Sequence, residues 1–167
     1  MTEETPTLYK GLVGVYADVS TVSKVMPETN SLTYRGYAVQ DLCEESDFEQ
    51  VAYLLWHGEL PNAAQLAAFQ AEERANRALS PALLRVLAEI PANAHPMDAI
   101  RTAVSFMGAE DPEAGDVSDA AQRRKAMRLL AKLPTAVAAT NRLSKGLAPI
   151  APDPSLPFCE NFFHMVF

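Results

Sequence analysis

Three histidines, His57, His95 and His164, are the residues whose chemistry is easiest to imagine in a catalytic or metal site. They lie far apart in the sequence, and none has an Asp, Glu or Cys at metal-ligand spacing. His57 precedes Gly58, where an imidazole can bond to the last carbonyls of a helix, and His164 falls in an apolar helix start, so structural roles are expected. His95 begins the run His-Pro-Met, which places it at a helix N-terminus. We favour a capping or packing role there, although that position can also face a cleft.

Carboxylates and thiols give no stronger signal. The pairs Glu44-Glu45 and Glu72-Glu73 are adjacent in sequence and point to different sides of a helix, so they cannot share a substrate proton and are expected at the surface. The two cysteines, at positions 43 and 159, have no metal-type spacing and are expected to be reduced and buried rather than disulfide-bonded or nucleophilic. The common phosphate-binding, metal and nucleophile motifs are absent. The sequence therefore assigns no catalytic, cofactor-binding or metal-ligating residue.

The charge balance limits the partners. Lys and Arg total 14 against 21 for Asp and Glu, a formal net charge of -7 among 167 residues, which disfavours nucleic acid and anionic lipid. The one dense basic run, Arg123, Arg124, Lys125 and Arg128, fits a solvated helix face, or else an anion or nucleotide contact. No stretch approaches the roughly 20 apolar residues that cross a bilayer, and residues 1–10 lack a signal-peptide core. A cytoplasmic protein without membrane or nucleic-acid partners is predicted.

Hydrophobic patterning divides the chain into three parts. Residues 1–10 form a polar leader. Residues 11–37 hold two short apolar pieces, 12–17 and 32–34, separated by Pro27, Asn30 and Ser31, which favours a small antiparallel β element. Residues 38–167 show helical spacing broken by Pro and Gly, so an all-α domain with one core is predicted.

Helix starts are marked by capping residues. Ser46 with Glu49 predicts a capping box for a helix that ends at Gly58, and Asn62 with Gln65 predicts a second helix reaching about residue 78. Its charged positions Glu72, Glu73, Arg74 and Arg77 suit a solvated face. Apolar faces are expected from Phe48, Val51, Ala52 and Leu55 in the first helix.

Further helices follow the same logic. Ser80 with Pro81 predicts a third helix, with Leu83, Leu84, Leu87 and Ile90 on its buried side. Residues 95–108 form a fourth, with an apolar stripe of Met97, Ile100, Val104 and Met107.

A long helix over 119–145 should be kinked or divided by Pro134, and the four prolines of 148–157 predict a connector. Residues 158–167 read as the opening of another helix. They end on Met165, Val166 and Phe167 without a cap, so the chain is expected to continue.

Several segments together resemble the citrate synthase family of bacterial citrate and 2-methylcitrate synthases. They are Ser31-Leu-Thr-Tyr-Arg-Gly-Tyr37, the run Phe48 to Pro61, Ala94-His-Pro-Met97, Arg101-Thr-Ala103, Gly108-Ala-Glu-Asp111, Ala131-Lys-Leu-Pro-Thr135, Pro149-Ile-Ala-Pro152 and Glu160-Asn-Phe162. Each segment alone is weak evidence for the resemblance, but the segments occur in the family's order over nearly all of residues 10–167. The sequence of residues 29–42 looks most like that of actinobacterial enzymes that accept propionyl-CoA as well as acetyl-CoA.

The resemblance implies a dimeric, almost wholly helical, two-domain enzyme that joins an acyl-CoA to oxaloacetate and releases CoA. Acyl-CoA is then a substrate, and no cofactor is implied. This chain would be the N-terminal half of the large domain, with residues 95–108 and 119–145 similar to the helices through which family members pair. The family's catalytic His and Asp residues and its arginine clamp find no match here, and His95 belongs to a family motif that is a helix start.

Three readings of function follow. The first is a fragment of a condensing enzyme, inactive alone, with apolar faces exposed that promote association. The second is a non-catalytic helical dimerisation module that keeps the same scaffold. An unrelated helical binding domain is a third, less favoured interpretation.

Overall fold

The computed structural model describes residues 8–16 and 18–167, which form a small sheet followed by seven helices. The sheet contains β1 (Ser23–Met26), β2 (Ser31–Tyr34) and β3 (Tyr37–Ala38), joined antiparallel in that order, with Val25 opposite Leu32 and Thr33 opposite Ala38. Short 3-10 turns occupy Lys10–Leu12 and Pro27–Thr29. The predicted all-α fold with one small β element is confirmed.

The first apolar piece of the predicted β element is not a strand. Residue 12 ends the 3-10 turn, residues 13–16 follow as exposed turn and coil, and position 17 lies outside the described residues. The strand is instead β1, whose more polar Ser-Lys-Val-Met sequence pairs with β2. Pairing in the sheet, rather than local hydrophobicity, decides which of the two pieces becomes extended.

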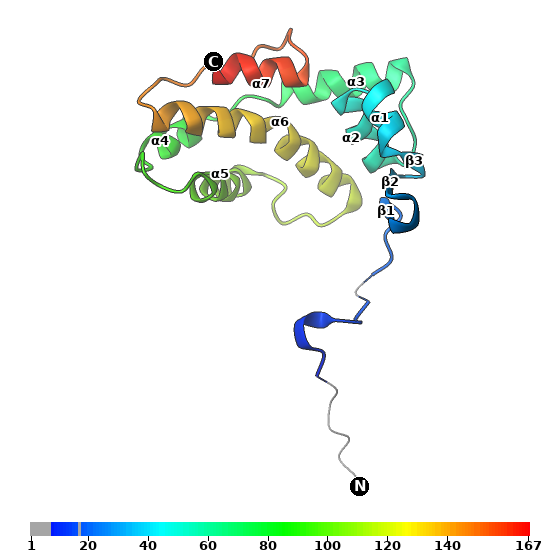
Figure 1. Ribbon diagram of the computed structural model, residues 1–167. Coiled ribbons are helices and arrows are strands. Elements are labelled where there is room, and N and C mark those ends of the chain that lie inside the picture. Colours follow the sequence, from blue (N-terminus) through cyan, green and yellow to red (C-terminus); the bar gives the residue numbers. More distant parts are fainter. Residues whose placement is uncertain (1–7, 17) are drawn as a thin grey trace.

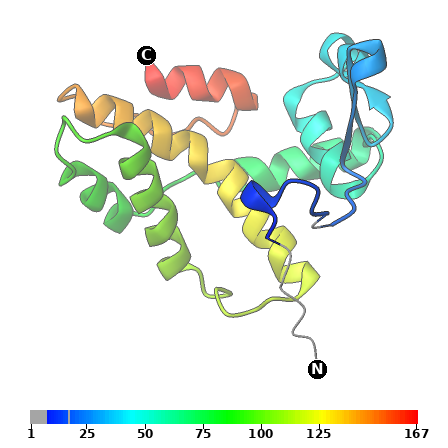
Figure 2. The ribbon, with the colours of Figure 1, turned by 60° about the horizontal axis from the view of Figure 1, so that its bottom comes forward.

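The helices are α1 (Val39–Glu45), α2 (Phe48–His57), α3 (Ala63–Ala75), α4 (Pro81–Ala88), α5 (Pro96–Glu110), α6 (Asp119–Ser144) and α7 (Phe158–Val166). Figure 1 shows α6 as the long central element, with α5 on one side and α7 on the other, and Figure 2 shows the same arrangement from a second direction. Among the described residues, no helix has the length and hydrophobicity required to span a membrane.

Most predicted caps are confirmed. The Asn62 carboxamide oxygen accepts from the Gln65 N–H at 3.0 Å, the Ser80 Oγ accepts from the Leu83 N–H at 2.9 Å, and His95 Nδ1 accepts from the Met97 N–H at 3.2 Å. The box predicted at Ser46 and Glu49 is wrong by one position. Asp47 is the N-cap of α2 and Gln50 closes the box, with its Oε1 2.8 Å from the Asp47 nitrogen.

The central core lies where α4 and α5 meet α6. It consists of Leu83, Leu87, Ala103, Met107, Ala136 and Ala139, all buried. Small alanines on α6 let the neighbouring helices approach closely, so the large side chains of α4 fill the space between them. Leu84 and Ile90, predicted to be buried, are only partly covered at the edge of this cluster.

Helix α6 remains continuous across Pro134, so the predicted division does not occur, although Figure 1 shows its axis bending along its length. Helix α5 runs two residues past the expected stop at Gly108 because glycine here is helical and the chain turns only at Asp111. The connector predicted over residues 148–157 is confirmed and begins three residues earlier, at 145; it returns the chain to pack α7 along α6.

Candidate functional site

The three histidines occupy separate places and form no common site. His95 is an exposed N-cap and His164 an exposed residue of α7, while His57 at the end of α2 stacks on Tyr53 with ring centroids 4.0 Å apart. His57 is exposed, but partial desolvation of its ring, with a smaller effect of the positive charge of Arg123, holds its pKa below the usual 6.5. Within the described part of the chain, no three His, Cys, Asp or Glu side chains gather in a way that could hold a metal ion.

The cysteines differ from expectation. Cys43 and Cys159 are both free thiols, but both are exposed rather than buried. Partial burial, with a smaller effect of the carboxylates Glu49 and Asp47, raises the pKa of the Cys159 thiol, which disfavours the nucleophilic thiolate.

The basic run on α6 binds acidic residues of the same chain. Arg128 forms ion pairs with Asp111 at 2.8 Å and with Glu113 at 2.9 Å, Arg124 also pairs with Glu113, and Lys125 donates to carbonyls of the 111–118 loop. A hydrogen bond from the Glu113 N–H, and to a smaller extent Arg128, lowers the pKa of Asp111. Hydrogen bonds from Arg124, and to a smaller extent from Arg128, lower the pKa of Glu113. The positive charges of Arg124 and Arg128 are thus largely neutralised, which weakens the alternative of an anion site there.

A buried ion pair was missed by sequence reasoning. Glu73 and Arg77, predicted on a solvated face, are each only 1% exposed. Arg77 also donates to the carbonyls of Asp153 at 3.0 Å and Leu156 at 2.9 Å. The four-residue spacing of Glu73 and Arg77 marks a possible pair, but their burial depends on the connector, which lies far along the chain.

A wide apolar groove of about 780 Å³ lies between α2, α6 and α7. We call it the aromatic groove. It is lined by Phe48, Trp56, Ala126, Leu129, Leu130, Leu133, Pro134, Val137, Phe158, Cys159, Phe162 and Phe163. No charged side chain is among these lining residues. Phe48, predicted on an apolar face of its helix, is 46% exposed in the groove, where its ring stacks on Phe158 at 4.4 Å.

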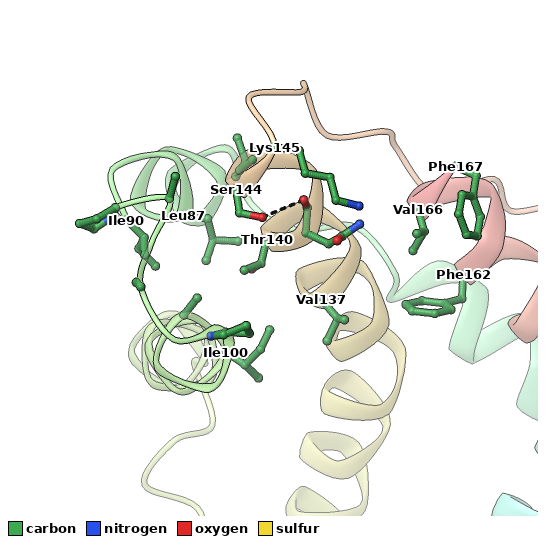
Figure 3. Close-up of a pocket in the computed structure, with 17 residues that line it drawn as sticks. Leu87, Ile90, Ile100, Val137, Thr140, Ser144, Lys145, Phe162, Val166 and Phe167 are labelled. Carbon is green, nitrogen blue, oxygen red and sulfur yellow. Dashed lines mark hydrogen bonds between the residues drawn. The ribbon is translucent and has the colours of Figure 1, made fainter.

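A second cavity of about 580 Å³ lies between the end of α4, the start of α5, and the adjoining parts of α6 and α7. Figure 3 shows Thr140 reaching from α6 toward the space between Leu87 and Ile100, with Phe162 and Val166 of α7 nearby. The Thr140 hydroxyl is buried without a hydrogen-bond partner among the described residues. Phe162 and Val137 line both cavities, so the two apolar surfaces adjoin each other.

These two surfaces suit the binding of apolar groups rather than proton transfer. General acid–base catalysis needs a titratable group within hydrogen-bond reach of the reacting atom. The aromatic groove offers only the Cys159 thiol, and the second cavity offers hydroxyl, amide and lysine groups at one rim. That this chain carries no catalytic residue stays a prediction.

Comparison with known proteins identifies the scaffold. The sequence model of the family described as "Citrate synthase, C-terminal domain" matches residues 11–167. A 2-methylcitrate synthase of Mycobacterium tuberculosis is 54% identical over 165 residues, which is 99% of this chain and 42% of that protein. A citrate synthase of Mycolicibacterium smegmatis is 52% identical over 98% of this chain and 44% of its own length.

A solved structure supports the same family. The citrate synthase of Pyrobaculum aerophilum superposes with a TM-score of 0.89 at 32% identity, over 96% of this chain and 42% of that one. In each comparison this chain spans about two-fifths of the related protein's length. The likeness extends through every helix described above, and the chain belongs to the citrate synthase family.

Proposed function

We propose that this chain supplies part of an enzyme that condenses an acyl-CoA with oxaloacetate and water. The products would be 2-methylcitrate from propionyl-CoA, or citrate from acetyl-CoA, with release of CoA. The observation that carries this proposal is the 54% identity to a 2-methylcitrate synthase along 99% of the chain. Acyl-CoA is a substrate, and the proposal includes no cofactor or metal. A place in propionate metabolism and in the cytoplasm belongs to the same proposal.

The chemistry explains why we expect the isolated chain to be inactive. Removing a proton from the weakly acidic carbon beside a thioester requires a positioned base, and the developing negative charge requires a donor or cation nearby. The aromatic groove has no charged lining, and the carboxylates Asp111 and Glu113 are held by arginines. We infer that the proton-transfer groups come from a part of the complete enzyme outside this chain.

Helices α5 and α6 supply the dimer contact in this proposal. Met97 and Val104 on α5 and Leu129 on α6 are large apolar residues left exposed, and Val104 and Leu129 line one shallow cavity with Gly108. Small and apolar residues along two neighbouring helices allow the close approach of a matching pair in a symmetric partner.

The direct test joins this chain to the part of the Mycobacterium tuberculosis 2-methylcitrate synthase that lies outside the matched region. The single-chain chimera should release CoA from propionyl-CoA and oxaloacetate, and the isolated 167-residue chain should not. Repeating the assay with acetyl-CoA compares the two acyl donors. A folded chimera without turnover on either substrate would remove the proposal and favour the alternative, a non-catalytic dimerisation module, which the apolar surfaces of α5 and α6 also fit.

A further inference from the structure

The second cavity, between the end of α4, the start of α5 and the adjoining parts of α6 and α7, has a mixed lining. Its volume of about 580 Å³ falls in the range of roughly 300–1,000 Å³ that is usual for small-molecule sites. Leu87, Ile90 and Ile100 form apolar walls, and Figure 3 shows them around the space that Thr140 reaches from α6. Ligand sites commonly combine such apolar walls with a few polar groups that fix orientation.

The polar groups of this lining gather at the C-terminal end of α6. They are the Thr140 hydroxyl, the Asn141 carboxamide, the Ser144 hydroxyl and the Lys145 ammonium group. Lys145 is the only charged residue in the lining, and among the residues that the structure describes it forms no ion pair. A ligand with one anionic end would find an uncompensated positive charge there.

The Thr140 hydroxyl has no partner in the folded chain. Its oxygen is buried, and within the described part of the chain it lacks even the backbone carbonyl one turn earlier that a helical threonine commonly uses. A buried hydroxyl without a hydrogen bond costs stability. An acceptor atom of a ligand at this wall of the cavity would supply the missing partner.

The C-terminus of α6 does not exclude an anion, although the C-termini of helices are partly negative. The Leu147 N–H donates to the Arg142 carbonyl at 2.9 Å. The Ser144 hydroxyl donates to the Asn141 carbonyl at 3.0 Å, which is the dashed line in Figure 3. Carbonyls that already accept hydrogen bonds repel a neighbouring anion less than free carbonyls do.

We propose that the second cavity binds an aliphatic carboxylate. The carboxylate pairs with Lys145 and accepts a hydrogen bond from the Thr140 hydroxyl. The hydrocarbon chain lies against Leu87, Ile90 and Ile100, where its burial drives binding. This inference goes beyond the proposed function, because it assigns a ligand site that the condensation reaction does not use.

The isoleucines report on the cavity without any substitution. The sequence contains only three, of which Ile90 and Ile100 line the cavity, while Ile150 lines neither the cavity nor the aromatic groove. In a chain with carbon-13 in its isoleucine methyl groups, octanoate should shift the NMR signals of Ile90 and Ile100 and leave that of Ile150 in place. The dissociation constant follows from the titration of the two shifts.

The charge of the ligand is tested with a matched pair of probes and a matched pair of variants. Lys145→Gln should weaken the binding of octanoate by about threefold or more, the scale of an exposed ion pair. Lys24→Gln, which removes an exposed lysine from β1, should leave the affinity unchanged. Octanol has the same hydrocarbon chain without the charge, so it should bind the parent chain more weakly than octanoate and should not distinguish Lys145→Gln from the parent.

Thr140→Val separates a ligand contact from a structural role. The substitution keeps the shape of the side chain and removes a hydroxyl that has no partner in the free chain. The free variant should therefore melt at the same temperature as the parent chain or higher, yet bind octanoate about threefold or more weakly. A purely structural role would not weaken binding in a variant that melts no lower than the parent.

Three results would overturn the inference on the isolated chain. They are unshifted Ile90 and Ile100 signals, octanol binding as tightly as octanoate, and unaltered affinity in Lys145→Gln and Thr140→Val. Calorimetric titration of the single-chain chimera with octanoate extends the test to a longer family chain. Lys145→Gln should weaken binding there as well, and a chimera in which it has no effect, or which does not bind octanoate, also overturns the inference.

Discussion

The guanidinium of Arg77 lies 2.7 Å from the carboxylate of Glu73 in a setting where each residue is about 1% exposed. Two of its nitrogens face Glu73, and the third holds the carbonyls of Asp153 and Leu156. One side chain thus links the end of α3 to the connector that precedes α7. This arrangement fixes the position of α7, and with it one wall of the aromatic groove.

Arg77→Ala is expected to lower the free energy of unfolding by about 3–5 kcal/mol, because it leaves Glu73 buried without a partner charge. Urea denaturation followed by circular dichroism measures the change. Arg85→Ala on the exposed surface of α4 is the control and should stay within about 0.5 kcal/mol of the parent chain. A loss for Arg77→Ala no larger than that of the control would show that the pair does not hold the connector.

The ion pairs of Arg128 should make the 111–118 loop sensitive to acid. The pKa values of Asp111 and Glu113 lie below their ordinary values of 3.8 and 4.5, so their contribution to stability is present above those values and lost as the pH falls through the lower folded-state values. Arg128→Gln should remove only part of this acid-dependent loss of stability, because the Glu113 N–H is the larger cause of the lowered pKa of Asp111 and Arg124 that of Glu113, and it should speed amide hydrogen exchange in the loop. Urea midpoints across a pH series measure the first effect.

The control for that prediction is Arg101→Gln. Arg101 pairs with Asp98 at 2.6 Å, but both side chains are mostly exposed, and such surface pairs contribute little. Arg101→Gln should leave the loss of stability at low pH unchanged. If Arg128→Gln and the parent chain lose stability equally steeply as the pH falls, Arg128 does not contribute to the lowered pKa values of Asp111 and Glu113.

Most of the helix boundaries were predictable because their determinants are local. The caps at Asn62, Ser80 and His95 each bond to an N–H two or three residues ahead, so neighbouring sequence is sufficient to place them. The error at Ser46 arose because Asp47, one residue later, also offers a capping oxygen, and the competition is settled by where α1 ends at Glu45.

The functional surfaces were less predictable because they depend on contacts between distant segments. Arg77 meets carbonyls 76 and 79 positions further along the chain, which no helical periodicity reveals. The spacing of Phe48 places it on an apolar face of α2 but does not reveal that α7 covers only part of its ring and leaves the rest in the groove. The exposed apolar faces themselves agree with the expectation for a partial family scaffold.

Ser80 joins two helices as well as capping one. Its Oγ accepts from the Leu83 N–H at 2.9 Å and donates to Glu110 at the end of α5 at 2.7 Å. Ser80→Ala should cost about 1 kcal/mol or more, the usual loss for an N-cap plus the tie to α5. Ser118→Ala, which removes the longer cap of α6 at 3.3 Å and a contact with Asp116 in the same loop but no tie to another helix, should cost less. Thermal unfolding of both variants measures the two losses of stability. Equal losses would mean that the contact of Ser80 with Glu110 adds no stability.

The pH response of His57 follows from its position at the end of α2. Partial desolvation of this exposed ring, and secondarily Arg123, holds its pKa below 6.5, so the unfolded chain takes up a proton more readily than the folded one. The stability linked to this group is complete above pH 6.5 and is lost as the pH falls through the lower folded-state pKa. The free energy of unfolding, measured across that pH range, should depend less on pH in His57→Gln than in the parent chain.

Two substitutions separate the causes of the His57 shift. Arg123→Gln removes the nearby charge and should raise the pKa of His57 only part of the way, because burial is the larger cause. Tyr53→Ala removes the ring stacked 4.0 Å from the imidazole and should raise it further by exposing the group to water. Proton NMR titration of the His57 ring measures each value. A pKa at or above 6.5 in the parent chain, or a larger rise from Arg123→Gln than from Tyr53→Ala, would contradict burial as the main cause.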